Sequence, residues 1–123
     1  MAKNILIIED EIWISALLRD FVTRFGYNVV DLVRFGEKVI EIIEKSNPKP
    51  DLILSDIYLA GALTGIDSAK MINEKYDIPI VFITAYSDDI TKAQMAEVKH
   101  EACFYKPFDE EELKKKMHEI LGE

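Results

Sequence analysis

The sequence predicts an α/β fold: a single doubly wound, five-stranded parallel sheet with helices on both faces. Short apolar runs alternate along the chain with longer segments whose apolar residues recur at helical spacing. The runs are continuous, which is typical of strands buried on both faces of a parallel sheet. Five strands alternate with five helices, and right-handed crossovers between parallel strands place helices on both sides of the sheet.

The predicted central strand is the apolar run 52–54, inside the stretch from Asp51 to Asp56. A carboxylate, that of Asp56, stands at its end. In open α/β sheets, ligands bind beyond the carboxyl ends of the strands, where the chain connections diverge to either side. Asp56 is therefore expected at the mouth of such a crevice.

The predicted strands are short runs rich in β-branched residues. They cover residues 4–8, 27–33, 52–54, 79–83 and 102–105. The first ends abruptly at the acidic residues 9–11, as a buried strand does on emerging into solvent. Asn28 and Asp31 interrupt the second, which indicates a place nearer the sheet edge. The fourth begins with Pro79, which is tolerated at a first strand position, and ends in Thr84.

The predicted helices have apolar residues every three or four positions. They cover residues 14–25, 37–45, 66–76, 88–98 and 110–121. Gly26 ends the first helix, Ser87 can cap the fourth, and Asp109 can cap the fifth. The apolar stripe of the fourth helix is weak, with Met95 to one side of it. The residues of that stripe are Ile90, Ala93 and Val98.

Length, charge and cysteine content limit the class of protein. The chain of 123 residues is expected to form one domain, residues 1–123, with its own hydrophobic core. Its net charge of −8 would repel a phosphate backbone, which argues against direct nucleic-acid binding. The single cysteine, Cys103, excludes an internal disulfide, and no apolar run is long enough for a signal peptide or membrane span. The cytoplasm is the default compartment on these grounds.

Chemically reactive side chains follow the predicted strands at one edge of the sheet. They are Glu9, Asp10, Asp56, Thr84 and Lys106. Three carboxylates beside one ammonium group repel one another unless a cation neutralises them, and oxygen ligands favour magnesium, manganese or calcium. Magnesium prefers one or two carboxylates together with phosphate oxygens. The pattern therefore predicts phosphoryl chemistry, with Asp56 as the nucleophile.

Five motifs mark the ends of predicted strands and the start of the third helix. They are Ile7-Ile8-Glu9-Asp10-Glu11, Leu52-Ile53-Leu54-Ser55-Asp56, Gly65-Ile66-Asp67, Ile83-Thr84-Ala85 and Tyr105-Lys106-Pro107-Phe108. Each motif alone is weak, but in this order the chain resembles the receiver domain of the two-component response regulators. The resemblance runs from Lys3 to about Leu121 and implies a flavodoxin-like strand order of 2-1-3-4-5.

The resemblance implies that Asp56 accepts a phosphoryl group from a phosphohistidine. The donor is a sensor histidine kinase or a histidine phosphotransfer protein. Mg²⁺, or Mn²⁺ in its place, would be bound by Asp10, Asp56 and the backbone carbonyl of Tyr58, with Glu9 acting through water. Many family members have two aspartates where this chain has Glu9 and Asp10. This is a common variant that is expected to leave metal binding intact.

The resemblance also implies a conformational switch. Lys106 would pair with the phosphoryl oxygens, and its bond to Pro107 is expected to be cis. Thr84 would turn inward to hydrogen-bond the phosphorylated site, and the ring of Tyr105 would then move from an exposed to an inward position. The change alters the surface that binds partners.

The resemblance further implies that side chains near the acceptor tune how readily water reaches the acyl phosphate. Tyr58 and Tyr86 stand two residues after the acceptor and two after the threonine, and Ala85 lies between that threonine and Tyr86. Our hypothesis is that the two tyrosine rings shield the acyl phosphate and slow its loss. Compared with the family that the chain resembles, the loop between Asp56 and Gly65 is one residue longer than the commonest spacing. Ala60 stands where the family frequently has proline, so the shape of this loop remains open.

Further partners implied by the resemblance are an output domain or protein of unknown kind and a second copy bound through the last two helices and last strand. On this interpretation the chain is not an enzyme beyond its own phosphoryl transfer and slow autodephosphorylation.

Three alternatives remain. An aspartate-nucleophile, magnesium-dependent phosphatase usually has two aspartates two residues apart after its first strand, whereas this chain reads Glu9-Asp10-Glu11-Ile12. A flavodoxin-like cofactor carrier needs a phosphate-binding loop where these acids stand. A receiver-like interaction module that works without phosphorylation usually lacks the acceptor, a metal acid or the lysine, all of which are present.

Overall fold

The fold is a parallel five-stranded sheet with strand order β2-β1-β3-β4-β5, as the computed structural model describes for residues 2–122. The strands are β1 (Asn4–Ile8), β2 (Asn28–Val33), β3 (Leu52–Ser55), β4 (Ile80–Thr84) and β5 (Ala102–Tyr105). The predicted fold class and strand order are confirmed. The polar interruptions of β2 agree with its place at one edge.

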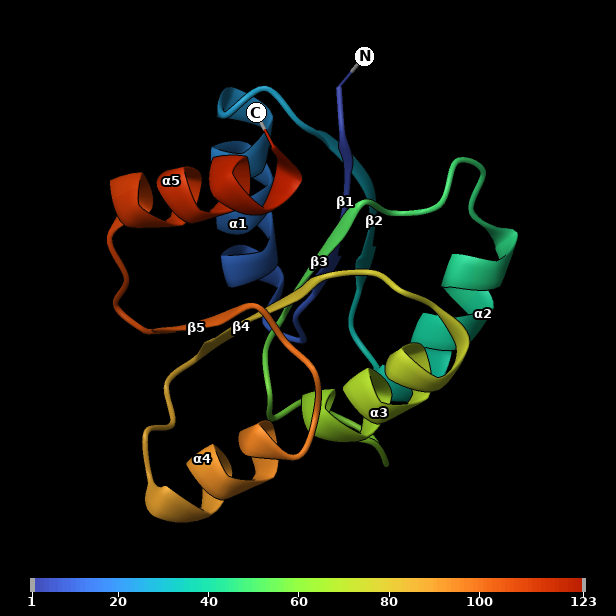
Figure 1. The fold of residues 1–123 in the computed structure, drawn as a ribbon, viewed down its shortest axis with the longest axis vertical. Coiled ribbons are helices and arrows are strands. Elements are labelled where there is room, and N and C mark those ends of the chain that lie inside the picture. The colour runs from blue at the N-terminus through green and yellow to red at the C-terminus, as the bar shows by residue number, and fades with distance from the viewer. Residues whose placement is uncertain (1, 123) are drawn as a thin grey trace.

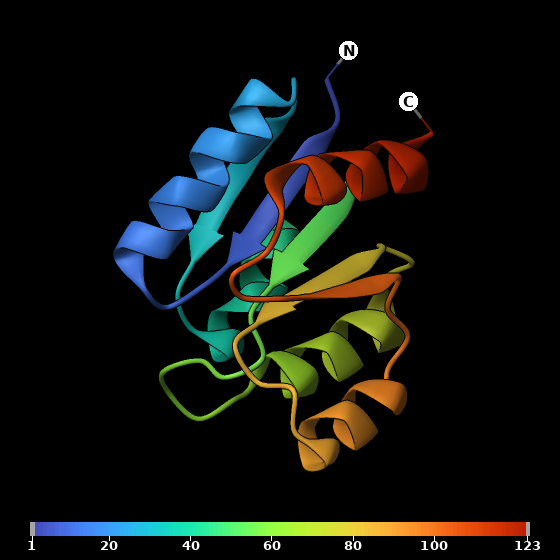
Figure 2. The ribbon, with the colours of Figure 1, turned by 90° about the vertical axis from the view of Figure 1, so that its left-hand side faces the viewer.

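Helices cover both faces of the sheet (Figures 1 and 2). The helices are α1 (Ile12–Arg24), α2 (Val39–Lys45), α3 (Gly65–Lys75), α4 (Asp89–Ala96) and α5 (Glu110–Leu121), with a 3₁₀ turn, η1 (Gly36–Lys38), before α2. In Figure 1, α1 and α5 lie on one side of the sheet, and α2, α3 and α4 lie on the other. None of the helices within residues 2–122 has the length and apolar character needed to span a membrane.

The core consists of two apolar layers, one on each face of the sheet. Leu6 and Phe82 belong to the layer under α2, α3 and α4, whereas Ile7 and Val81 belong to the layer under α1 and α5. Successive side chains of a strand point to opposite faces, so a continuous apolar run supplies both layers. Every residue of β3 and β4 is buried, as the sequence of these runs predicted.

The fourth helix differs from the prediction at its first turn. The N-cap residue is Asp88 and not Ser87, because the Asp88 carboxylate accepts a hydrogen bond from the backbone N–H of Thr91. An aspartate two or three residues before the free N–H groups is as good a cap as a serine, and the sequence offered both.

The buried face of α4 also differs from the predicted stripe. Thr91 and Met95 are buried, and Val98 is buried just after the helix, whereas Ile90 is 71% exposed and Ala93 is exposed. The prediction counted apolar residues only. Thr91 occupies the inner position because its hydroxyl group is hydrogen-bonded there, which removes most of the cost of burying it.

The start of α3 lies directly against the end of β3. Thr64 and Asp67 form a capping box, in which the Thr64 hydroxyl accepts from the Asp67 N–H at 3.1 Å and the Asp67 carboxylate accepts from the Thr64 N–H at 2.9 Å. A Cβ atom at Gly65 would overlap the backbone carbonyl of Asp56 and lie 2.9 Å from Cα of Ile57. Only glycine permits this approach, which holds the acceptor strand end against the helix.

Candidate functional site

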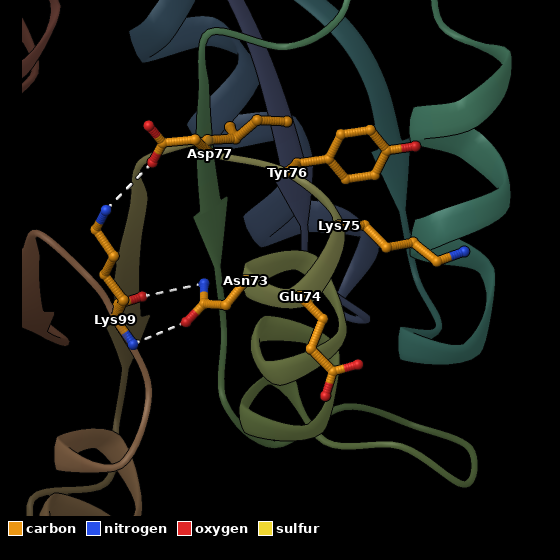
Figure 3. Close-up of a pocket in the computed structure, with 7 residues that line it drawn as sticks. Asn73, Glu74, Lys75, Tyr76, Asp77 and Lys99 are labelled. Atoms are coloured by element: carbon orange, nitrogen blue, oxygen red, sulfur yellow. Dashed lines mark hydrogen bonds and ion pairs between the residues drawn. The ribbon is translucent and has the colours of Figure 1, made fainter.

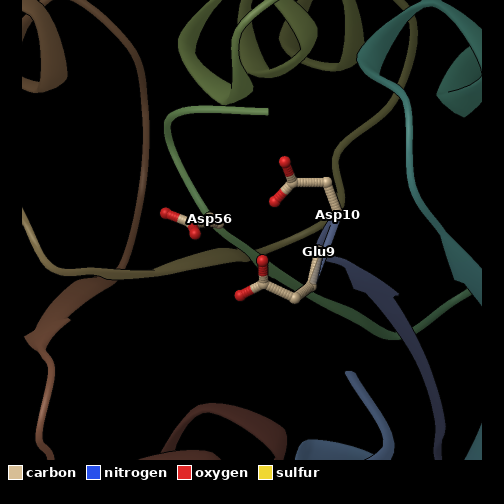
Figure 4. Close-up of side chains that lie close together, drawn as sticks. All are labelled: Glu9, Asp10 and Asp56. Atoms are coloured by element: carbon tan, nitrogen blue, oxygen red, sulfur yellow. The ribbon is translucent and has the colours of Figure 1, made fainter. Parts of the chain in front are cut away.

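Three carboxylates meet at the carboxyl ends of β1 and β3, where the chain connections diverge to opposite faces of the sheet. The carboxyl groups of Glu9, Asp10 and Asp56 surround a common space (Figure 4). One oxygen of each lies within 4.8 Å of the others. The backbone N–H of Asp56 donates to the Ile8 carbonyl at 2.9 Å, which continues the β1–β3 pairing into the site.

Lys106 completes this cluster from the end of β5. Its Nζ lies 2.8 Å from Oε1 of Glu9 and 3.1 Å from Oδ2 of Asp56. Burial lowers the pKa of Lys106, but the hydrogen bonds and charges of the two carboxylates outweigh it and raise the pKa overall. The lysine is therefore a permanent positive charge in the cluster. Its peptide bond to Pro107 is cis.

Glu9 is the most deeply buried acid of the group, with 1% of its surface exposed. Burial, together with the charge of Asp56, raises the pKa of Glu9 from 4.5 to about 7, and the hydrogen bond from Lys106 only partly opposes this rise. Its second oxygen accepts from the Glu11 N–H at 3.2 Å. The cluster therefore has an unfavourable charge on Glu9 at neutral pH, which an added cation would relieve.

Asp10 is tied to the loop that follows β3. Its Oδ2 accepts from the Ala60 N–H at 3.1 Å, and its backbone carbonyl accepts from Arg34 Nε at 3.3 Å. Phe35 forms an isolated parallel bridge with Ala60, and Glu37 accepts from the Ala62 N–H at 3.4 Å. These contacts give the longer loop a defined shape, which the sequence had left open.

Thr84 ends β4 beside the cluster and is fully buried. Its hydroxyl oxygen accepts from the Tyr86 N–H at 3.2 Å, so its own proton remains available to donate elsewhere. Tyr105 is paired with Thr84 in the register of β4 and β5, and 37% of its surface is exposed. The two residues thus lie on adjacent strands, with one buried and the other at the surface.

The rings of Tyr58 and Tyr86 contact each other in the wall of the cleft that contains Asp56. Their centroids are 4.4 Å apart, with an interplanar angle of 63°, and the Tyr58 hydroxyl lies 2.7 Å from Oγ1 of Thr91. Both rings and Ala85 line an open cleft of about 530 Å³, whose other walls include Asp10, Asp56 and Lys106.

The structure therefore brings together the site residues expected from the sequence. Glu9, Asp10, Asp56 and Lys106 form the charged centre. Thr84 lies beside it, Tyr58, Ala85 and Tyr86 form the rim, and Tyr105 lies on the adjacent strand. Sequence reasoning missed Thr91 and the Ala60 N–H. The Asp88 to Thr91 spacing of a helix cap was the signal for Thr91.

Comparison with protein families identifies the chain. The family model for the response regulator receiver domain matches residues 5–118. The chain belongs to the response regulator receiver domain family. Receiver domains act in two-component signalling, are signalling switches and not enzymes in the usual sense, and bind Mg²⁺ in an acidic pocket. The oxygen donors of the acidic cluster fit that ion.

Curated relatives of this receiver domain are longer proteins. It is 39% identical over 88 residues to the phyllosphere-induced regulator PhyR of Methylorubrum extorquens. The matched segment covers 72% of this chain and 33% of PhyR. It is 34% identical over 113 residues to the uncharacterized transcriptional regulatory protein YrkP of Bacillus subtilis. This matched segment covers 92% of this chain and 47% of YrkP. The chain thus spans less than half the length of both.

Solved structures of receiver domains have the same fold. The domain from PhyR of Erythrobacter litoralis is 32% identical, with a TM-score of 0.84 over 98% of this chain and 91% of that one. The signal receiver domain of a modulated diguanylate cyclase from Desulfovibrio desulfuricans G20 is 28% identical, with a TM-score of 0.90 over 99% of this chain and 95% of that one.

A hollow of about 290 Å³ lies at the opposite end of the sheet of this receiver domain, near the starts of β4 and β5. Asn73 and Lys99 exchange two hydrogen bonds there, with lengths of 2.8 and 3.4 Å, and Lys99 Nζ pairs with Asp77 at 3.2 Å (Figure 3). These contacts join the end of α3 to the connection before β5. Their groups are paired with one another, and we assign this hollow a structural role.

Proposed function

We propose that this receiver domain is a phosphorylation-dependent switch in which Asp56 accepts a phosphoryl group from a phosphohistidine. The donor is a sensor histidine kinase or a histidine phosphotransfer protein. The observation that carries the proposal is the position of the Asp56 carboxylate. It lies in an open cleft, 9% exposed, with Lys106 Nζ at 3.1 Å and two further acids beside it.

The transfer step needs a nucleophilic oxygen that is oriented and ionised. Asp56 Oδ1 accepts from the Ile57 N–H at 2.7 Å, and Oδ2 accepts from Lys106, so the carboxylate plane is fixed from both sides. One carboxylate oxygen attacks phosphorus, the bond from phosphorus to the histidine nitrogen breaks, and the imidazole leaves with its electron pair. The product is an acyl phosphate on Asp56.

Asp10 and Asp56 would bind the metal ion directly, together with the backbone carbonyl of Tyr58, and Glu9 would act through water. Mg²⁺ supplies positive charge to the phosphoryl oxygens when bound, and Mn²⁺ could take its place. Lys106 would provide the second positive charge. It already contacts Glu9 and Asp56, and therefore needs only to exchange a carboxylate oxygen for a phosphoryl oxygen.

The response to phosphorylation begins at Thr84. Its hydroxyl proton is available, since the oxygen accepts from the Tyr86 N–H. Donation to a phosphoryl oxygen would draw Thr84 toward the site and open space for the Tyr105 ring on the adjacent strand. The half-exposed position of Tyr105 is compatible with such an inward movement.

The altered surface would bind an output domain or protein. We place the receiver domain at residues 1–123 and propose a cytoplasmic protein that does not bind membranes. The net charge of −8 argues against direct nucleic-acid binding. Dimerisation through α4, β5 and α5 is a second way to use this surface. Outside signalling, its own phosphoryl transfer and slow autodephosphorylation would be its only reactions.

The test is incubation with acetyl phosphate and Mg²⁺, followed by measurement of the intact mass. The unchanged chain is expected to gain one phosphoryl group, and Asp56→Asn to gain none. Asp31→Asn, which alters an exposed carboxylate on β2, is the matched control and should behave like the unchanged chain. An unmodified chain, or a modified Asp56→Asn variant, would contradict the proposal. Phosphate release from unrelated esters at enzymatic rates would support a phosphatase instead.

A further inference from the structure

Thr91 is a completely buried polar side chain in the first turns of α4. Its backbone N–H donates to Asp88 Oδ2 at 3.0 Å, and its hydroxyl donates to Asp88 Oδ1 at 2.8 Å. These two hydrogen bonds lower the pKa of Asp88, so the carboxylate is ionised and can only accept. The single hydroxyl proton of Thr91 is therefore committed to Asp88.

This commitment fixes the direction of the next hydrogen bond. The Tyr58 hydroxyl lies 2.7 Å from Oγ1 of Thr91, and either oxygen could donate if the pair stood alone. Because the Thr91 proton points to Asp88, the phenol of Tyr58 is the donor and Thr91 is the acceptor. A directed chain of bonds thus runs from Tyr58 through Thr91 to Asp88.

The other end of this chain lies at the acceptor. Tyr58 is two residues after Asp56, and its ring contacts the Tyr86 ring in the wall of the cleft that contains Asp56 and Lys106. With 38% of its surface exposed, the Tyr58 ring has room to rotate away from the cleft. Of the contacts described for its side chain, the bond to Thr91 is the one that fixes the phenol end.

We propose that Thr91 is a positioning residue, which holds the Tyr58 ring over the acceptor and thereby sets the lifetime of the phosphorylated state. This proposal rests on the proposed function, because it concerns loss of the phosphoryl group from Asp56. Thr91 does not touch the reacting atoms; it acts through Tyr58. Without the tether, the ring rotates outward and water reaches the acyl phosphate more often.

Thr91→Val is the informative substitution. Valine has nearly the shape of threonine but no hydroxyl group, so the buried face of α4 keeps its packing while the tether is lost. Serine retains the hydroxyl group and is expected to restore the tether. Tyr58→Phe keeps the ring and removes the donor. Ser68→Ala, which removes a hydroxyl group that is 1% exposed on α3 and bonds to Thr64, is the matched control.

The experiment phosphorylates each variant with acetyl phosphate and Mg²⁺, removes the donor by desalting, and follows loss of the phosphoryl group by intact mass. Thr91→Val and Tyr58→Phe are each expected to lose it about fivefold faster than the unchanged chain, the effect of one hydrogen bond of typical net strength. The double variant should be no faster than either single variant, because both remove the same bond. Thr91→Ser and Ser68→Ala should keep the original rate.

A second measurement does not depend on phosphorylation. The NMR signals of the Tyr58 ring can be assigned in the unphosphorylated protein by their loss in Tyr58→Phe. Their chemical shifts should move toward those of a freely rotating tyrosine ring in Thr91→Val and stay unchanged in Thr91→Ser. Equal decay rates for Thr91→Val and the unchanged chain would overturn the inference and leave the proposed function intact. Failure of the unchanged chain to take up a phosphoryl group would overturn both.

Discussion

Replacing Glu9 with glutamine is expected to stabilise the protein above neutral pH when divalent cations are absent. The pKa of Glu9 is raised by burial and by the charge of Asp56, from 4.5 to about 7. A folded-state pKa above the unfolded-state value means that the folded protein binds the proton more tightly. The contribution of Glu9 to stability is therefore fully present below pH 4.5 and is lost as the pH rises to 7. Glutamine retains an oxygen for Lys106 but has no charge to desolvate.

The size of the effect follows from the rise in pKa. Each pKa unit corresponds to ~1.4 kcal/mol, so the rise from 4.5 to about 7 means that ionised Glu9 costs at most ~3.5 kcal/mol above its folded-state pKa. This figure already includes the opposing hydrogen bond from Lys106, which lowers the pKa of Glu9 and which is weaker with glutamine as the acceptor. We expect Glu9→Gln to raise the free energy of unfolding by ~1–2 kcal/mol near pH 8 and to leave it unchanged near pH 4.

The assay is urea denaturation of both proteins at the two pH values with a chelator present. Comparison of the variant with the unchanged chain at each pH cancels the titration of all other groups. Glu11→Gln removes the same charge from an exposed position and should change stability by less than ~0.5 kcal/mol at both. A Glu9→Gln difference that is the same at both pH values, or a less stable variant near pH 8, would refute the reasoning.

Three further outcomes can be measured. Gly65→Ala should destabilise the fold by more than ~3 kcal/mol in urea denaturation, because its Cβ would overlap the backbone of Asp56, and an unchanged midpoint would contradict this. Mg²⁺ at 100 times its dissociation constant should stabilise the unphosphorylated protein by ~2.7 kcal/mol, and the same Mg²⁺ concentration should stabilise Asp10→Asn less. Equal stabilisation of the unchanged chain and Asp10→Asn would show that Asp10 is not a metal ligand. The double variant Tyr58→Asn, Tyr86→Ala should lose its phosphoryl group several times faster than the unchanged chain, and a rate that hardly changes would refute shielding by these rings.

The sequence was sufficient to predict the sheet because its central strands are uniformly apolar. A continuous apolar run such as 52–54 is stable only where both faces of the strand are buried. Because the strands are parallel, their carboxyl ends lie at the same edge of the sheet. The charged centre followed from that rule alone. Asp56, Glu9 and Lys106 are separated by up to 97 residues in sequence, yet each is the first residue after a strand.

Where the prediction failed, the missing information was which polar groups find partners after folding. Ser87 and Asp88 are both good caps, and only the tertiary packing of α4 selects one of them. Thr91 was not placed on the buried face, because the prediction counted apolar residues only. Its hydroxyl group is accommodated there by Tyr58, which is 33 residues away in the loop after β3. The periodicity of apolar residues cannot detect a partner of this kind.

The contacts of Lys106 connect the electrostatics of the site with the proposed switch. Without a phosphoryl group, Lys106 divides its hydrogen bonds between Glu9 and Asp56, and this arrangement holds the ends of β1, β3 and β5 together. A phosphoryl group on Asp56 adds negative charge where Lys106 already bonds, so the lysine must reorient toward it. Lys106 follows Tyr105 directly, and its backbone N–H donates to the carbonyl of Thr84 at 2.8 Å. In the proposed switch, its reorientation would act on Thr84 and Tyr105 through the backbone. Lys106→Met should therefore still gain a phosphoryl group by intact mass, while the NMR signals of the Tyr105 ring stay in place.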